Sequence, residues 1–130
     1  MSINTITAVR VYTKGMNYET FKRTRIWIIE IYGGLIHKYR MEKGNKKRFD
    51  EIRISVEPQI MMEFFEKIYD FVRTAEFYGT IIDDCEHQVT LYYGPVHKEV
   101  FKETAVKGSM DLIGLIEDFV RKNGGQSDDD

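Results

Sequence analysis

Two histidines stand at matching positions in a segment that the chain uses twice. Residues 29–38 align with residues 89–98 without a gap, and His37 matches His97. Histidine changes its charge near neutral pH and binds metals, so such a pair could transfer protons or share a metal ion. A metal site needs three or four ligands, however, and neither histidine has a carboxylate or cysteine at ligand spacing. The sequence therefore predicts local hydrogen bonds for both histidines, with no metal or cofactor.

The densest polar cluster spans residues 83–87 and contains Cys85. It offers every common type of metal ligand, and a cysteine near a histidine can act as a nucleophile. Neighbouring residues of an extended segment point to opposite sides, however, and the cluster lacks the spacing and the glycine of a calcium loop. Activation of a cysteine also requires contact in space rather than proximity in sequence. We interpret the cluster as a polar loop and predict no catalytic residue in it.

Basic side chains gather in residues 38–48, which we call the basic hairpin. The predicted binding surface comprises the hairpin's cations and the aromatic residue after it: Lys38, Arg40, Lys43, Lys46, Lys47, Arg48 and Phe49. A basic ribbon with aromatic side chains could follow a phosphate backbone or stack on unpaired bases. Lysine also protects edge strands against aggregation, a use that needs no ligand. We favour the second use because the net charge of the chain is −2, and keep nucleic-acid or anion binding as the alternative.

Alternation of apolar and polar residues predicts the strands that position these side chains. The expected ranges are 6–12, 25–32, 35–42, 48–56, 88–93 and 96–104. Gly33 and Gly34 join the second range to the third, and a two-residue hairpin turn needs positive φ at both positions. The pattern therefore indicates an antiparallel sheet of five to six strands.

Apolar residues at helical spacing predict two amphipathic helices. The first begins at Pro58 and ends near Gly79, and the second is capped by Ser109 and stopped by Gly124. Each helix has one apolar stripe, which must be buried against another element. We therefore predict the α+β class, as a two-layer sandwich with both helices on one face of the sheet.

The repeated segment predicts two hairpin–helix units. Each copy is followed by a helical pattern that closes on Asp-Phe-Val-Arg, at residues 70–73 and 118–121. The distance from the hairpin to this tetrapeptide is 32 residues in the first copy and 20 in the second, so the first copy carries 12 more. Those residues match one additional strand and its turn. Chance similarity between two strand–glycine–strand hairpins is the alternative, and it leaves the predicted architecture unchanged.

Length and composition indicate one domain in a reducing compartment. At 130 residues, the chain is expected to fold as a single domain over residues 1–123, followed by a flexible acidic tail at residues 124–130. The lone Cys85 cannot form an internal disulfide, and no apolar run reaches the length of a membrane span. The start also lacks the pattern of a signal peptide. We therefore expect a cytoplasmic protein without a membrane partner.

Charge is distributed unevenly along the chain. Residues 1–73 carry an excess of five positive charges, and residues 74–130 an excess of seven negative charges. Folding brings sequence halves together, so we expect this asymmetry to disappear in space.

The absence of common catalytic motifs argues against several classes of enzyme and favours a binding protein. The sequence contains no P-loop, no glycine-rich dinucleotide motif, no nucleophile elbow and no zinc-protease motif. Aromatic residues, which interfaces favour, are numerous, and the candidates for exposure are Tyr12, Tyr32, Tyr92 and Phe49. The sequence therefore predicts a non-enzymatic module that binds another protein or a second copy of itself, as a regulator or inhibitor. The alternatives are nucleic-acid binding through the basic hairpin and a small enzyme whose site is assembled from dispersed residues.

Overall fold

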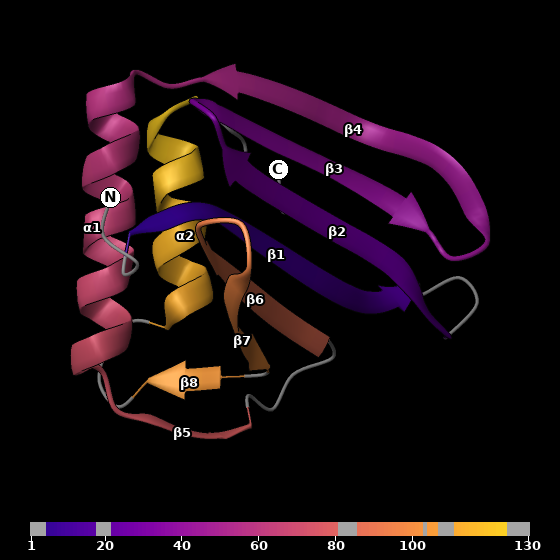
Figure 1. The fold of residues 1–130 in the computed structure, drawn as a ribbon. Helices are drawn as coiled ribbons and strands as arrows, with labels where there is room; N and C mark the ends of the chain where they lie inside the picture. The colour runs from indigo at the N-terminus through magenta and orange to yellow at the C-terminus, as the bar shows by residue number, and fades with distance from the viewer. Residues whose placement is uncertain (1–4, 18–21, 81–85, 103, 107–110, 125–130) are drawn as a thin grey trace.

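Six strands form one antiparallel sheet in the computed structural model, which describes residues 5–17, 22–80, 86–102, 104–106 and 111–124 (Figure 1). The strands are β1 (Ile6–Asn17), β2 (Lys22–Tyr32), β3 (Leu35–Glu42), β4 (Asn45–Ser55), β6 (Glu86–Tyr93) and β7 (His97–Lys102). Their order across the sheet is β4-β3-β2-β1-β6-β7. Strand β1 therefore pairs with both β2 and β6, and joins the first group of strands to the second.

Two helices and a small second sheet complete the described fold. The helices are α1 (Pro58–Thr74) and α2 (Leu112–Lys122), and β5 (Phe77–Thr80) pairs with β8 (Thr104–Val106) in an antiparallel two-stranded sheet. The predicted α+β class, with an antiparallel sheet of six strands, is therefore confirmed. Within the described residues, neither helix is long and apolar enough to cross a membrane.

Strands β5 and β8 were absent from the sequence prediction, and helix α1 ends earlier than predicted. The helix stops at Thr74 rather than near Gly79, because Ala75 is extended with φ −76° and ψ 145°. The chain then continues as β5, where the Phe77 ring contacts Phe101 at 5.2 Å and Phe71 at 6.4 Å between centroids. We attribute the earlier end of the helix to these aromatic contacts of Phe77, which favour an extended segment over the helix that the sequence pattern predicts.

The turn glycines and the end of α2 agree with the sequence. Gly33 and Gly34 have φ values of 57° and 77°, as the two-residue turn requires, and Gly124 follows α2 with φ 107°. The N-cap of α2 is Asp111, whose side chain accepts a hydrogen bond from the Gly114 N–H. The prediction of Ser109 as the cap was therefore wrong, because the helix begins at Leu112; Ser109 itself and the tail beyond Gly124 lie outside the described residues.

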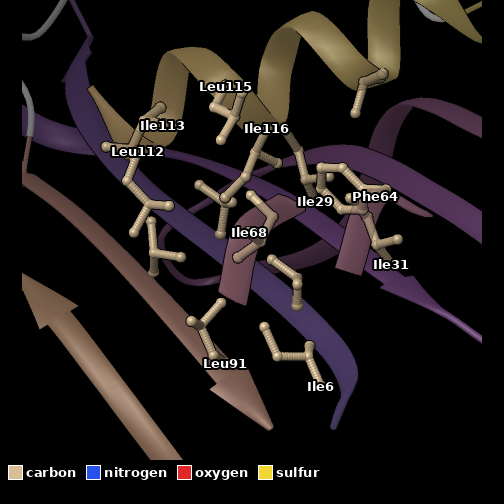
Figure 2. Packing of buried hydrophobic residues seen from close by; sticks show 14 of the residues in the cluster. Ile6, Ile29, Ile31, Phe64, Ile68, Leu91, Leu112, Ile113, Leu115 and Ile116 are labelled. Atoms are coloured by element: carbon tan, nitrogen blue, oxygen red, sulfur yellow. The ribbon is translucent and has the colours of Figure 1, made fainter. Parts of the chain in front are cut away.

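Side chains from both helices and from alternating positions of four strands form one hydrophobic cluster (Figure 2). In the middle of the sheet, Val9 pairs with Ile31 and Leu91, while Val11 pairs with Ile29 and Val89. All of these side chains are buried. Each fully buried side chain of this size stabilises the fold by about 1.5–3 kcal/mol. Strand β1 therefore supplies the centre of the core as well as the centre of the sheet.

The two helices contact each other through an aromatic stack. The rings of Phe64 in α1 and Phe119 in α2 lie 3.8 Å apart between centroids with an interplanar angle of 10°. Phe64 is 5% exposed, as is Leu115 on the buried stripe of α2. Both helices are thus fixed to the cluster by large apolar side chains.

Truncation of either side chain tests this packing. Phe64→Ala should lower the free energy of unfolding by about 3–5 kcal/mol and Leu115→Ala by about 2–5 kcal/mol, because each leaves a cavity in the core. Urea unfolding followed by circular dichroism measures both losses. Val96→Ala is the control, since Val96 is 93% exposed and its truncation should change little. Wild-type stability in both core variants would contradict the packing described here.

Candidate functional site

One face of the six-stranded sheet carries charged and hydrogen-bonding side chains, and we call it the polar face. Arg10 pairs with Thr90 on one side and Glu30 on the other, Glu30 pairs with His37, and His37 pairs with Arg53. Directly opposed residues of antiparallel strands point to the same face. The five side chains therefore form one row across β6, β1, β2, β3 and β4.

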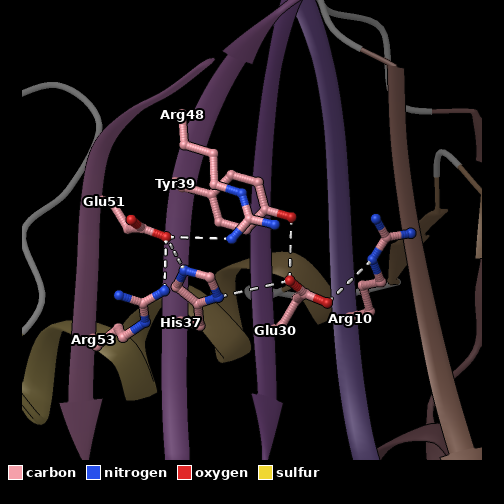
Figure 3. A network of polar contacts seen from close by, with 7 residues as sticks. All are labelled: Arg10, Glu30, His37, Tyr39, Arg48, Glu51 and Arg53. Atoms are coloured by element: carbon pink, nitrogen blue, oxygen red, sulfur yellow. Dashed lines mark hydrogen bonds and ion pairs between the residues drawn. The ribbon is translucent and has the colours of Figure 1, made fainter. Parts of the chain in front are cut away.

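His37 lies at the centre of a hydrogen-bonded network on this face (Figure 3). Its Nε2 is 2.6 Å from Glu51 Oε2, and its Nδ1 is 3.8 Å from Glu30 Oε1. The Tyr39 hydroxyl donates to Glu30 Oε1 at 3.2 Å, and Arg10 Nε lies 3.8 Å from Glu30 Oε2. The network therefore links strands β1, β2, β3 and β4.

Glu51 is the acceptor at the edge of this network. Besides His37, it accepts hydrogen bonds from Arg48 at 3.3 Å and Arg53 at 3.2 Å. The hydrogen bond from His37 is the largest influence that lowers the pKa of Glu51, and the two arginines lower it further. Burial, followed by the negative charge of Glu30, raises the pKa of the Tyr39 hydroxyl. The network thus holds an ionised Glu51 and a neutral Tyr39.

A histidine between two carboxylates resembles a general base in composition, but its position does not suit that role. A general base must reach the proton that it abstracts, and His37 is only 6% exposed. Its ring also lies against Tyr39, with centroids 4.8 Å apart. Within the described residues, no group of three or more His, Cys, Asp or Glu side chains could hold a metal ion. We interpret the network as a structural link between strands.

The structure does not bring His37 and His97 together. Three strands separate β3 from β7 in the sheet, so these two strands lie roughly 19 Å apart. His97 is exposed at the start of β7 and contacts Tyr93, with ring centroids 5.4 Å apart. The turn between Tyr32 and Leu35 has two residues and the turn between Tyr93 and His97 has three. The gapless alignment therefore matches two histidines that point to opposite faces of the sheet.

The arginines of the basic hairpin are engaged in contacts within the protein. Arg40 lies 3.3 Å from Asp50 and 3.2 Å from Glu42, and its guanidinium lies 4.9 Å above the Phe49 ring. The Arg48 guanidinium lies 4.5 Å above the ring of Tyr39. Both arginines therefore already have aromatic rings as partners, and Arg40 also has carboxylates.

The lysines of the basic hairpin occupy different environments. Lys38 is 8% exposed, Lys47 Nζ lies 5.2 Å above the Phe49 ring, and Lys43 is exposed in the turn between β3 and β4. The side chain of Lys46 lies outside what the structure describes. The predicted surface therefore includes at least one buried cation and does not form a continuous row of exposed charges.

The polar loop at residues 83–87 lies largely outside the described residues, and Cys85 is among those not described. His87 is described at the start of β6, where its Nδ1 lies 3.2 Å from the Thr13 hydroxyl. This contact connects β6 to β1.

A groove of about 860 Å³ runs along α1, and the sequence prediction did not include it. We call it the α1 groove. Its wall on the helix is a stripe of residues at helical spacing, and its lining residues are Thr5, Ile6, Gly33, Gly34, Pro58, Met61, Met62, Phe65, Glu66, Tyr69 and Asp70. The second apolar stripe of α1, with Met61, Met62 and Phe65, was the sequence signal for this surface.

The opposite wall of the α1 groove depends on a close approach between the β2–β3 turn and the end of β4. The Gly34 carbonyl accepts a hydrogen bond of 2.8 Å from the Val56 N–H. A Cβ atom at Gly34 would lie 3.3 Å from the Val56 carbonyl oxygen, and φ there is +77°. Glycine is therefore suited to this position, both by space and by backbone conformation.

An ion pair fixes the other end of α1 to β7. Arg73 donates to the two oxygens of Glu99 at 3.1 Å and 2.7 Å, and its guanidinium lies 4.9 Å above the ring of Tyr69. The Tyr93 hydroxyl also donates to Glu99. The hydrogen bonds from Arg73 lower the pKa of Glu99, while burial raises that of Tyr93.

No protein-family model matches this chain, and no curated protein matches its sequence.

The lowered pKa of Glu99 predicts how its ion pair responds to pH. The folded-state pKa lies below the unfolded-state value, so the contribution of Glu99 is complete above the unfolded-state pKa and is lost as the pH falls through the folded-state value. Glu99→Gln should therefore lower the free energy of unfolding by about 1 kcal/mol at neutral pH, and by much less at an acidic pH below the folded-state pKa of Glu99.

Urea unfolding of both proteins at the two pH values measures this difference. Glu66→Gln, at an exposed position of α1, is the matched control and should have little effect at either pH. An equal loss of stability in Glu99→Gln at neutral and acidic pH would show that the charge of Glu99 is not what stabilises the contact.

Proposed function

We propose that this protein is a non-enzymatic interaction module, and that the α1 groove binds an apolar segment of a partner protein. The groove itself carries the proposal, because it exposes apolar side chains along most of a helix. The stripe from Pro58 to Asp70 extends over about 18 Å of helix axis. That length suits a segment of about three helical turns or five extended residues.

The side chains of the groove have the chemistry of a protein interface. Met62 is 53% exposed, while Met61 beside it is 4% exposed and connects the groove floor to the core. Methionine adapts its shape to different partners, and methionine and aromatic residues are enriched in interfaces. An exposed Met62 over a buried Met61 therefore provides an adaptable wall on a rigid floor.

The charge of the groove indicates which partner it accepts. Glu66 and Asp70 line it and are exposed. Acidic side chains at the rim favour a partner with complementary charge and disfavour an acidic one. We therefore propose an apolar partner segment that carries lysine or arginine beside its anchoring residues.

We further infer that both helices cover one face of the sheet in a two-layer sandwich. The support is that α1 and α2 contribute to the same hydrophobic cluster as Val9, Val11 and Ile31. The strand residues that alternate with Val9, Val11 and Ile31, such as Arg10 and Glu30, belong to the polar face. This arrangement gives the module two separate surfaces, the α1 groove and the polar face.

Nucleic-acid binding through the basic hairpin receives less support from the geometry. Arg40 and Arg48 already contact carboxylates at 3.2–3.3 Å, and Lys38 is buried. A phosphate contact by these residues would first have to replace those partners. The hairpin is better explained as a stabilised pair of strands at the end of the sheet.

Selection of peptides against the protein tests the groove. A displayed peptide library should yield sequences that combine apolar anchors with lysine or arginine, and their affinity is then measured by fluorescence polarisation. Met62→Glu should weaken binding at least about tenfold, since it places a charge in the apolar wall. Ile60→Glu is the matched control, because Ile60 is 39% exposed on the same helix and does not line the α1 groove. It should retain the wild-type affinity.

Two results would contradict the proposal. One is a set of selected peptides that bind wild type, Met62→Glu and Ile60→Glu equally, because their site would then lie elsewhere. The other is self-association in sedimentation that Met62→Glu abolishes and Ile60→Glu does not. That result would identify a second copy of this chain, rather than a different protein, as the occupant.

A further inference from the structure

We propose that the polar face binds single-stranded nucleic acid, with one unpaired base held between Tyr32 and Tyr92 above Ala8. This site uses a different surface from the α1 groove and a different class of partner, so it stands independently of the function proposed above. Three observations carry it: the register of three neighbouring strands, the exposure of Tyr32, and the charge of the polar face.

The register places the two tyrosines on either side of a small residue. Ala8 in β1 pairs directly with Tyr32 in β2 and with Tyr92 in β6. Directly paired residues point to the same face, and Ala8 is two positions from Arg10, so all three side chains belong to the polar face. The short side chain of Ala8 leaves a space between two aromatic side chains on the neighbouring strands.

The width of this space suits a flat aromatic ring. Neighbouring strands are about 4.8 Å apart, so the two tyrosines start about 10 Å from each other across β1. Aromatic pairs stack with centroids about 4.5–7 Å apart. A ring above Ala8 would therefore lie within stacking distance of Tyr32 and Tyr92 at once.

The tyrosines are accessible to such a ring. Tyr32 is 49% exposed and Tyr92 is partly exposed. Within the described part of the chain, neither ring is paired with another aromatic ring. Both can therefore stack on a ligand without giving up an existing aromatic contact.

The polar face is positively charged in a protein whose net charge is −2. By pairing and contact, six cations among the described side chains belong to it: Arg10, Lys14, Arg48, Arg53, Lys98 and Lys102. Three carboxylates of the described residues share the face, those of Glu30, Glu51 and Glu86. The excess of three positive charges on this face complements a phosphate backbone. Because Arg48 and Arg53 already contact Glu51, the exposed Lys98 and Lys102 are the side chains that contact phosphates.

One exposed lysine lies beside the tyrosine pair, and a second lies further along the same strands. Lys98 pairs with Tyr92, and Lys102 pairs with Gln88 further along the same two strands. The site therefore offers an aromatic gap with cations at its side, which is how single strands are bound without sequence preference. A duplex keeps its bases stacked on each other, so it could supply phosphates to the lysines but no base to the gap.

Fluorescence anisotropy with a labelled oligothymidine tests the proposal, with a duplex of equal length as the comparison. We expect the single strand to bind at least about tenfold more tightly than the duplex at low salt. If about three phosphates are contacted, the logarithm of the association constant should fall with that of salt concentration with a slope of about −2.

Substitutions separate stacking from charge. Tyr32→Ala and Tyr92→Ala should each weaken binding about tenfold, whereas Tyr32→Phe should keep the wild-type affinity because it keeps the ring. Lys98→Ala should reduce the salt slope by about 0.7, and Lys67→Ala, at an exposed position of α1, should leave it unchanged. Tyr32→Ala should also remain folded with a cooperative thermal transition, since half of Tyr32 is already exposed.

Several results would overturn the proposal. Equal affinity for single strand and duplex, or unchanged affinity in Tyr32→Ala and Tyr92→Ala, would exclude base stacking between the tyrosines. Binding of thymidine monophosphate as tightly as of the oligonucleotide would indicate a nucleotide site rather than a strand site. Absence of any salt-dependent anisotropy change at low salt would exclude nucleic acid as the partner.

Discussion

The fold depends on the double pairing of β1. This strand forms antiparallel ladders with β2 on one side and β6 on the other, so the strands before α1 and those after it belong to one sheet. Without β1, the β6–β7 hairpin would be an isolated two-stranded ribbon, which is at best marginally stable in water. Val9 and Val11, each 1% exposed, then join the side chains of both strand groups to the two helices.

The same strand also positions both candidate surfaces. Its buried positions alternate with Ala8 and Arg10, which lie on the polar face between residues of β2 and β6. Ile6, at its start, lines the α1 groove together with the β2–β3 turn. A shift of β1 by one residue would exchange its buried and polar side chains and remove the gap at Ala8. One register therefore governs the core, the groove wall and the tyrosine pair.

Local sequence patterns predicted much of the fold, whereas they did not predict the candidate sites. Strand alternation and Gly33-Gly34 predicted β2, β3 and their turn, because these signals depend on neighbouring residues alone. The end of α1 depends on contacts of Phe77 with residues distant in sequence, so the helical pattern extended the prediction too far. Predicting the tyrosine pair requires the register of β1 with two other strands. Predicting the charge of the polar face requires the order of the strands in the sheet. The repeat alone did not indicate that His37 and His97 point to different faces of the sheet. One additional turn residue reverses the side to which a strand residue points.

The proposed binding site depends on Ala8 of β1 as the floor of a gap that holds an unpaired base. Isotope-filtered nuclear Overhauser spectroscopy on labelled protein with unlabelled oligothymidine tests this contact most directly. We predict cross-peaks from thymine protons to the Ala8 methyl group and to the ring protons of Tyr32 and Tyr92. Cross-peaks confined to other residues, such as Lys43 in the basic hairpin, or their absence in a complex that has formed, would contradict it.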